Sequence, residues 1–184
     1  MGKTYPFFAY FCRFRTGDLG RMDEDGWVKV TGRLKELYKL ENGKYVSPSP
    51  IEEAIGMSKF VSQVVLCGAN RPYNIALIVP EWDNIREELG FGQDVSQEQI
   101  ISDPRLQQLM DAEIHDSCYM RKKYEIPTKW AFVAPFTAEN NMVTPKMSIR
   151  RHKVMQAYED LINHLYGDDP VVSEIPDAEQ REAV

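Results

Sequence analysis

The stretch Arg15-Thr16-Gly17-Asp18 is followed in order by Asp23-Glu24-Asp25-Gly26-Trp27 and by Gly32-Arg33-Leu34-Lys35-Glu36-Leu37. A glycine beside an aspartate is typical of a tight turn, and Asp-Gly is a strong signal for the turn of a β-hairpin. The residues from Trp27 to Thr31 then predict a strand. This order predicts short strands and turns, with the Asp18 carboxylate on a glycine turn and a Gly-Arg pair at the start of a loop.

Composition and charge limit the class of protein. The chain has 184 residues, of which 43% are hydrophobic, as expected for a globular protein with one core. Its formal net charge of -6 argues against broad nucleic-acid binding, which needs Lys and Arg massed on one face. The three cysteines are widely spaced and odd in number, so we expect neither a disulfide framework nor a CxxC metal site, and a reducing compartment fits best. No apolar run approaches the roughly 20 residues that a membrane-spanning helix needs.

A second hairpin is predicted directly after these motifs. Leu37 to Leu40 and Lys44 to Val46 flank Glu41-Asn42-Gly43, and Asn-Gly is another strong hairpin signal. Ser47-Pro48-Ser49-Pro50 then predicts the start of a helix with an acidic first turn, which suits the helix dipole.

Strand and helix patterns alternate through the rest of the chain. Residues 61–69, 74–80 and 130–133 have strand character and predict a small sheet. Apolar side chains at helical spacing predict one helix from Pro104 to about Lys122 and a last helix from about Ser148 to Tyr166. This alternation predicts a compact α+β domain.

Together, these motifs resemble the carboxy-terminal part of adenylate-forming (AMP-binding) enzymes, and specifically of long-chain fatty acyl-CoA synthetases. The resemblance implies that residues 1–34 are the short β remnant of a large adenylating domain. It also implies that Lys35 is a hinge and that residues 35–167 form a small α+β lid domain with a central sheet and flanking helices. Residues 168–184 are acidic and interrupted by prolines, which predicts a flexible tail. No phosphate loop rich in glycine, serine and threonine lies upstream of Arg15, so the resemblance covers only the last part of the family's architecture.

Three residues are candidates for nucleotide binding. Asp18 stands on a tight turn, where its carboxylate can accept hydrogen bonds from two vicinal hydroxyls, as a ribose offers; the alternative is a carboxylate that only caps the turn. The resemblance implies that Arg33 reaches the sugar and phosphate of the nucleotide, a role that suits the fixed fork of guanidinium donors. Arg15 is the third candidate, and a role as a surface strand arginine stays open for it.

The resemblance also implies a mechanical role and a coenzyme A binding role. Lys35 corresponds to the pivot about which the lid rotates between adenylation and thioester formation, where a few residues absorb large backbone changes. Asn42, Gly43 and Lys44 correspond to the loop that lines the pantetheine tunnel, where a glycine permits close backbone approach. A plain hairpin turn is the alternative for this loop.

The carboxy-terminal motif departs from the family pattern. The chain has Thr144-Pro145-Lys146-Met147-Ser148-Ile149-Arg150-Arg151, so Ser148 occupies the position where the resemblance implies a catalytic lysine. That lysine places positive charge against the α-phosphate, which a serine cannot do. Lys146 is the candidate replacement because a lysine stem is long and flexible; the alternative is a solvated loop lysine. The basic run from Arg150 to Lys153 is either a contact for coenzyme A phosphates or a solvated face.

By resemblance, we expect a fragment of a long-chain fatty acid-CoA ligase, which forms an acyl-adenylate with ATP and then a thioester with coenzyme A. The expected partners are a fatty acid, ATP with Mg2+ and coenzyme A, without nucleic acid, and the fragment is expected to be inactive alone. His115, His152 and His164 lack a consistent ligand spacing, so we expect no protein-bound metal. The expected location is the cytoplasm, or the periphery of the endoplasmic reticulum or another internal membrane through the missing domain. The alternative, motivated by Ser148, is a free-standing, non-catalytic lid-like module that binds coenzyme A or a protein partner.

Overall fold

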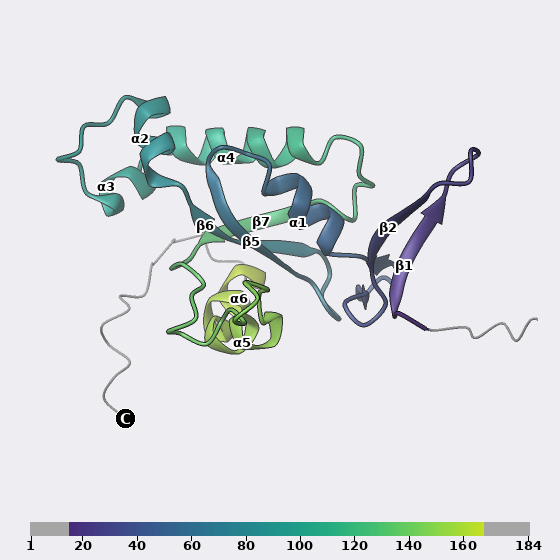
Figure 1. The fold of residues 1–184 in the computed structure, drawn as a ribbon. Helices are drawn as coiled ribbons and strands as arrows, with labels where there is room; N and C mark the ends of the chain where they lie inside the picture. The colour runs from purple at the N-terminus through teal and green to yellow at the C-terminus, as the bar shows by residue number, and fades with distance from the viewer. Residues whose placement is uncertain (1–14, 168–184) are drawn as a thin grey trace, which may run out of the picture.

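The computed structural model describes residues 15–167, which form an α+β fold around a three-stranded sheet. Helices cover both faces of this sheet, and a two-stranded ribbon lies to one side (Figure 1). The α+β class predicted from the sequence is therefore confirmed. The predictions for residues 1–14 and for the tail from 168 to 184 lie outside the described residues.

The ribbon consists of the antiparallel strands β1 (Asp18–Met22) and β2 (Val28–Arg33). Its turn is the predicted Asp-Gly hairpin, in which Gly26 has a φ of 87°. Such a left-handed backbone favours glycine because a side chain at that position would be strained. The Asp23 carboxylate stabilises the turn by accepting a hydrogen bond from the N–H of Trp27 at 2.8 Å.

The second predicted hairpin is also present, as strands β3 (Tyr38–Lys39) and β4 (Tyr45–Val46). Helix α1 (Ser49–Ile55) follows at once and begins with a proline in its first turn. Proline is favourable there because its missing N–H would have no partner inside the helix. Glu52 makes the first turn acidic, as the sequence predicts.

The central sheet has the strand order β5-β6-β7. Strand β5 (Val61–Cys67) is antiparallel to β6 (Asn74–Pro80), and β7 (Pro127–Phe132) is parallel to it. Strand β5 ends at Cys67 and not at Ala69 as predicted, because the chain turns there: the carbonyl of Gly68 accepts a hydrogen bond from the N–H of Arg71 at 3.1 Å.

Three helices connect β6 to β7, since parallel strands need a long crossover. They are α2 (Trp82–Leu89), α3 (Gln97–Ile101) and α4 (Pro104–Ser117). The sequence pattern predicted only α4, and it placed the end of that helix too late. The helix ends at Ser117 because the backbone of the next residue, the buried Cys118, leaves the helical region with φ -103° and ψ 11°.

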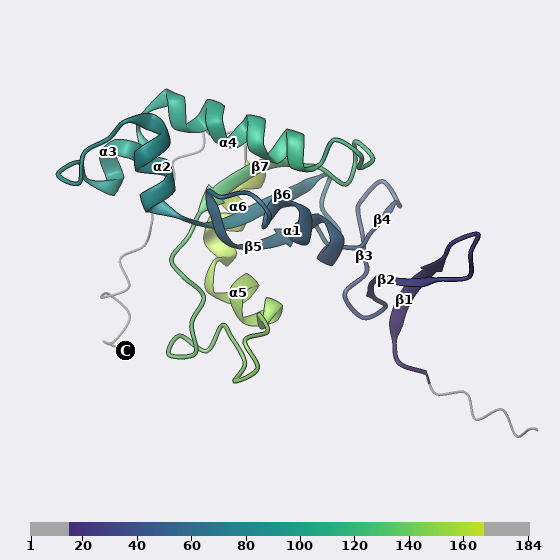
Figure 2. The ribbon, with the colours of Figure 1, turned by 45° about the horizontal axis from the view of Figure 1, so that its top comes forward.

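The predicted last helix is in fact two helices, α5 (Arg151–Ala157) and α6 (Glu159–Tyr166). The break is at Tyr158, whose backbone leaves the helical region with φ -109° and ψ 23°. The Tyr158 ring is buried and lies against Phe136, with 6.5 Å between the ring centroids. The break allows both short helices to pack on the same face of the sheet (Figures 1 and 2).

Apolar side chains fill the space on both faces of the sheet. Because successive residues of a strand point to opposite faces, each strand contributes to two cores. The core toward α1, α2 and α4 contains Leu66, Ala76, Ile78 and Phe132. The core toward α5 and α6 contains Val65, Ile75, Leu77 and Val133. Burial on both faces explains why β6 is an almost continuous apolar run.

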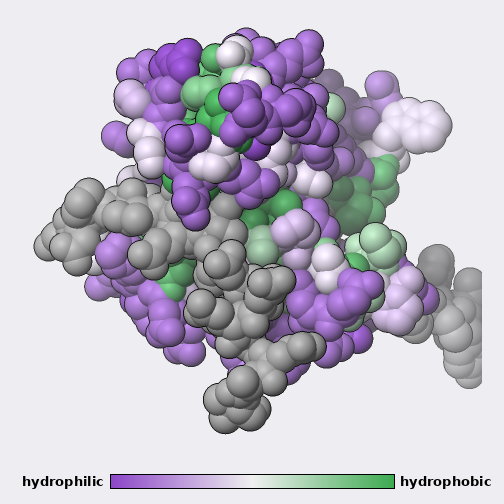
Figure 3. Space-filling view, turned by 90° about the vertical axis from the view of Figure 1, so that its left-hand side faces the viewer, coloured by the Kyte–Doolittle hydropathy of each residue, from purple (hydrophilic) through white to green (hydrophobic). Residues whose placement is uncertain are grey.

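The end of the molecule that carries α2 and α3 has a mostly hydrophilic surface, with apolar residues in smaller groups between the polar ones (Figure 3). Within residues 15–167, no helix has the length and apolar character needed to cross a membrane.

Candidate functional site

Asp18 and Arg33 face each other across the two-stranded ribbon. They are cross-strand partners, and the Arg33 Nε lies 3.5 Å from the Asp18 Oδ1. The Arg33 side chain is 70% exposed and that of Asp18 is 34% exposed. An ion pair this exposed contributes at most about 1 kcal/mol to stability. A ligand can therefore replace this ion pair with its own contacts to Asp18 and Arg33 at little cost in free energy.

This ion pair lies at a hollow of about 560 Å³ between the ribbon and helix α1. Two hydrogen bonds organise its wall: Ser49 Oγ donates to Glu36 Oε2 at 2.8 Å, and the Arg121 guanidinium donates to the Pro50 carbonyl at 2.7 Å. The hollow offers carboxylates that can accept from hydroxyls and guanidinium groups that can donate to phosphates. Its lining includes Asp18, Lys29, Arg33, Glu53 and Arg121.

Arg15 and Lys35 lie just outside the ribbon, and both are exposed. The carbonyl of Gly17 accepts a hydrogen bond from the N–H of Leu34 at 2.8 Å, which joins the two segments where they leave the ribbon. Arg15 does not line the hollow beside Asp18. The backbone around Lys35 forms an exposed turn that can change conformation without disturbing a core, as a hinge requires. The hinge role stays a prediction.

The turn Asn42-Gly43-Lys44 is exposed, and Gly43 has a φ of 85°. The Asn42 side-chain oxygen accepts a hydrogen bond from the N–H of Lys44 at 3.1 Å, which holds the turn closed. The positive φ, and not a lack of space, explains why a glycine stands at position 43. A Cβ there would contact only the Cε of Lys39, at 3.7 Å.

Lys146 and Ser148 lie on a tight loop between β7 and α5. The loop is closed by a bridge between Val143 and Ile149, and the carbonyl of Ser148 accepts a hydrogen bond from the N–H of Thr144 at 2.9 Å. Met147, between the two candidates, has a φ of 61°. Lys146 and Ser148 are both exposed, so the loop presents the lysine to solvent near the position where the family pattern has its lysine.

The structure does not bring Lys146 to the Asp18–Arg33 pair. The loop with Lys146 follows β7 and lies beside α5, whereas the ribbon stands at the other end of the molecule (Figures 1 and 2). The loop and the ribbon lie far apart in both views. The candidate residues therefore form two separate surfaces in this chain.

Sequence reasoning missed an ion pair between Glu52 of α1 and Arg151 of α5. Both guanidinium Nη atoms donate to the carboxylate oxygens at 2.7 Å, and Nη1 also donates to the carbonyl of Leu66 at 2.9 Å. The N–H of Leu66 donates to the same carboxylate at 2.6 Å. Burial is the largest single influence on the pKa of the Arg151 guanidinium and lowers it, but the hydrogen bonds to Glu52 and the nearby negative charges together raise the pKa above its usual value. Arg151 thus joins two helices to the edge of β5, and its charge is paired with Glu52. His152 and Lys153 of the same basic run are exposed, and a contact of this run with coenzyme A phosphates stays a prediction.

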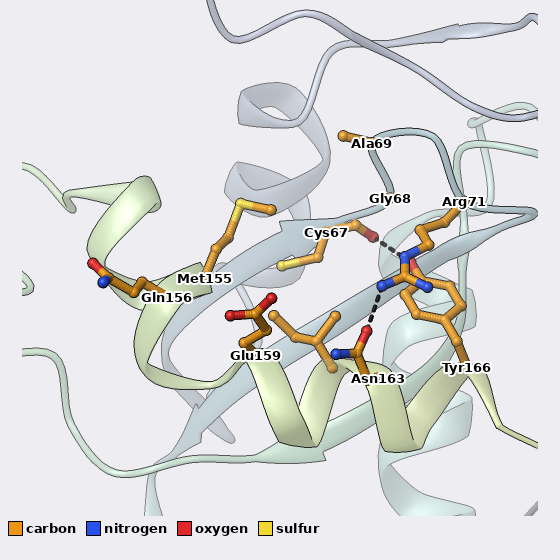
Figure 4. Close-up of a pocket in the computed structure, with 10 residues that line it drawn as sticks. Cys67, Gly68, Ala69, Arg71, Met155, Gln156, Glu159, Asn163 and Tyr166 are labelled. Atoms are coloured by element: carbon orange, nitrogen blue, oxygen red, sulfur yellow. Dashed lines mark hydrogen bonds between the residues drawn. The ribbon is translucent and has the colours of Figure 1, made fainter.

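A smaller hollow of about 320 Å³ lies between the end of β5 and the helices α5 and α6 (Figure 4). The Arg71 guanidinium lies over the Tyr166 ring, 4.7 Å from its centroid, and donates a hydrogen bond to Asn163. Burial raises the pKa of the Cys67 thiol to about 12, so this thiol stays protonated and unreactive at neutral pH. In the part of the chain that the structure describes, no group of three or more His, Cys, Asp or Glu side chains could hold a metal ion.

One buried amide joins the second hairpin to the sheet. Asn74 is completely buried, and its side-chain oxygen accepts a hydrogen bond from the Tyr38 hydroxyl at 2.7 Å. Its amide nitrogen donates to the carbonyls of Tyr124 and Glu125 at 2.9 and 3.0 Å. Burial raises the pKa of Tyr38, so the hydroxyl remains a donor. This network fixes β3 and the segment before β7 against the same end of β6.

Comparison with known proteins confirms the resemblance seen in the sequence. The family described as AMP-binding enzyme C-terminal domain matches residues 36–170, which is most of the chain. Fatty acyl-CoA synthetase B of Dictyostelium discoideum is 32% identical over 163 residues, covering 84% of this chain and 24% of its own length. A long-chain-fatty-acid-CoA ligase of Mycobacterium tuberculosis is 29% identical, covering 85% of this chain and 27% of its own length. The chain thus spans only about a quarter of the length of these relatives.

Solved structures show the same relationship. The adenylation domain of a carboxylate reductase from Mycobacterium chelonae aligns with a TM-score of 0.69 and 25% identity, covering 84% of this chain and 23% of its own. The A domain of a carboxylic acid reductase from Segniliparus rugosus, in complex with AMP and a co-purified carboxylic acid, aligns with a TM-score of 0.65 and 25% identity. That alignment covers 82% of this chain and 23% of the reductase domain.

Proposed function

Since this chain belongs to the AMP-binding enzyme C-terminal domain family, we propose that it is the hinge and lid of a long-chain fatty acid-CoA ligase. Its similarity to fatty acyl-CoA synthetases supports the substrate class. In this proposal, residues 1–34 are the end of a large AMP-binding domain, and residues 35–167 are the lid. In the reaction the fatty acid carboxylate attacks the α-phosphate of ATP, which forms the acyl-adenylate and releases pyrophosphate, and the thiol of coenzyme A then displaces AMP to form the thioester.

The observation that carries this proposal is the Asp18–Arg33 pair beside the hollow between ribbon and lid. Asp18 would accept hydrogen bonds from the ribose hydroxyls, and Arg33 would donate to the sugar and phosphate, which their weak mutual ion pair permits. Mg2+ would arrive with ATP. Lys35 would be the pivot, and rotation about it would bring either the Lys146 loop or the Asn42-Gly43-Lys44 turn toward the large domain.

Ser148 supports a second candidate function, a non-catalytic lid-like module that binds coenzyme A or a protein partner. A hydroxyl cannot supply the positive charge that stabilises the transferring phosphate. Lys146, exposed on the same loop, has the charge and the reach to replace it. The two candidates therefore differ in whether Lys146 acts on the acyl-adenylate step.

A chimera distinguishes these functions. The last quarter of Dictyostelium discoideum fatty acyl-CoA synthetase B would be replaced by this chain, and acyl-CoA formation would be measured with fatty acid, ATP and coenzyme A. We expect product from the chimera, none from the chain alone, and a loss of at least about tenfold in adenylation rate for Lys146→Gln. A folded chimera that makes no acyl-adenylate would support the non-catalytic module.

For its location we propose the cytoplasm, or the periphery of the endoplasmic reticulum or another internal membrane through the large domain. Cell fractionation tests this: protein in the soluble fraction, or in a membrane fraction released by salt, fits the proposal. Protein released from membranes only by detergent would contradict it.

A further inference from the structure

The two neighbours of Lys35 in the chain are tied to different parts of the molecule. On the ribbon side, the N–H of Leu34 donates a hydrogen bond to the carbonyl of Gly17 at 2.8 Å. On the other side, the Glu36 carboxylate accepts a hydrogen bond from the hydroxyl of Ser49 at 2.8 Å. Lys35 is exposed and lies between these two ties. A single residue therefore separates the segment that is fixed to the ribbon from the segment that is fixed to helix α1.

The tie on the α1 side ends on a firm anchor. Ser49 is the first residue of α1, and Ile51 and Ile55 of the same short helix are only 2% and 1% exposed. Ser49 and Glu36 are both partly buried, and a hydrogen bond to an ionised carboxylate is stronger than one between neutral groups. Glu36 should therefore move together with the core of the lid.

The hydrogen bond that spans Lys35 is of a different kind. The N–H of Glu36 donates to the carbonyl of Arg33 at 3.1 Å, which closes a turn with Leu34 and Lys35 at its centre. A change in the backbone angles of Lys35 alters the distance between these two backbone groups. It does not alter the distance between Glu36 and Ser49, because both residues follow Lys35 in the chain. Rotation at Lys35 can therefore open the turn and leave the bond to Ser49 intact.

We propose that Glu36 is a positioning residue, which makes the residue after the pivot part of the rigid lid and so confines the backbone change to Lys35. The effect on catalysis rests on the proposed function, in which the lid works in two orientations, whereas the tie itself rests on the hydrogen bond to Ser49. A lid without this bond would also bend at residues 36 and 37. It would then spend less time in each productive orientation.

Hydrogen exchange of the Glu36 amide, followed by NMR in the purified chain, tests the tie without any substrate. In Ser49→Ala this amide should exchange about fivefold faster than in the unmodified chain, because the bond that holds its residue is lost. Ser58→Ala is the matched control: the Ser58 hydroxyl donates to the Glu113 carboxylate at 2.7 Å, the same kind of bond just beyond the other end of α1. This control should leave exchange at Glu36 unchanged.

The positioning role is tested in the chimera with the Dictyostelium discoideum synthetase, by two separate rates. One is the release of pyrophosphate, and the other is the formation of acyl-CoA from acyl-adenylate supplied to the enzyme. We expect Ser49→Ala to slow both about fivefold, because both orientations become less populated. Glu36→Gln, whose amide oxygen can still accept from Ser49, should keep most of both rates, and Ser58→Ala should change neither.

Equal exchange at Glu36 in the Ser49→Ala and Ser58→Ala variants would overturn the tie. Faster exchange in Ser49→Ala, with both rates unchanged in an active chimera, would overturn the positioning role and leave the proposed function intact. Equal slowing by Ser49→Ala and Ser58→Ala would also overturn it, since lost stability alone would then explain the effect. An unmodified chimera that is folded but inactive would contradict the proposed function, and with it the positioning role, while the exchange measurement would still decide the tie.

Discussion

At the scale of single residues, the Glu52–Arg151 pair decides how the last two helices attach to the rest of the fold. Its side chains are 15% and 26% exposed, so both charges are largely removed from water. Burial of a charge is costly unless an opposite charge and hydrogen bonds compensate for it. Here the two residues satisfy each other and both polar backbone groups of Leu66, on the edge strand of the sheet.

Glu52→Gln should lower the free energy of unfolding by about 1–3 kcal/mol, because it leaves the Arg151 charge without a buried partner. Urea denaturation followed by circular dichroism measures this change. Glu53→Gln is the control, since Glu53 is exposed on the same helix and should change stability little. Equal midpoints for the two variants would contradict a structural role for the pair.

Because of Cys67, the free energy of unfolding should depend on pH in the alkaline range. Burial raises its pKa from 9.0 to about 12. The unfolded chain releases the thiol proton near pH 9 while the folded chain keeps it, so this contribution is complete below pH 9 and is lost as the pH rises toward 12. Burial raises the pKa of Tyr166 in the same direction. We expect the free energy of unfolding, measured by urea denaturation, to fall as the pH rises from 9 toward 12, and Cys67→Ala to reduce that fall; an identical fall in the variant would contradict this.

At the scale of secondary-structure elements, the short β3–β4 hairpin depends on contacts with the sheet. Two residues per strand are too few to form a stable hairpin alone. The hydrogen bond from Tyr38 to the buried Asn74 supplies a tie between β3 and β6. The hairpin thus holds its turn, with Gly43 and Lys44, in a defined place.

Tyr38→Phe should lower the free energy of unfolding by about 1–3 kcal/mol, because it leaves the Asn74 oxygen buried without its donor. Thermal or urea denaturation measures the loss. Tyr45→Phe, on the neighbouring strand, is the matched control, since Tyr45 is 61% exposed. A Tyr38→Phe variant as stable as the Tyr45→Phe variant would show that the hydroxyl does not hold the hairpin.

At the scale of the whole molecule, the β1–β2 ribbon has the most exposed apolar surface among the strands. Its exposed apolar side chains are Met22, Trp27, Val28, Val30 and, just beyond β2, Leu34. A ribbon of two strands is marginal in water unless other structure covers one of its faces. The proposed large domain would provide that cover, because these residues would continue its strands.

The ribbon should therefore exchange its amide hydrogens quickly in the isolated chain and slowly in the chimera with the preceding part of the Dictyostelium discoideum synthetase. Hydrogen exchange of residues 28–33, followed by mass spectrometry, measures this. The central strand β6, buried in both proteins, is the internal control. Rapid exchange of the ribbon in an active chimera would contradict the proposed packing.

The amino-acid sequence by itself determined the local structure. Asp25-Gly26 and Asn42-Gly43 predicted both hairpins, because glycine adopts the positive φ that these turns require. The runs with strand character predicted the three strands of the sheet, and their alternation with helix patterns along the chain predicted the α+β class. The motifs around Asp18 and Arg33 also indicated the family, which the comparison confirmed.

Only the tertiary structure decided where the helices stop and which charges meet. The break at Tyr158 accompanies a buried contact with Phe136, and α4 ends where the buried Cys118 leaves the helical backbone region. Glu52 and Arg151 are 99 positions apart in sequence, and Lys44 meets Lys122 only around Tyr124. Local periodicity carries no information about such pairs, because packing of distant segments, and not backbone preference, determines the distance between them.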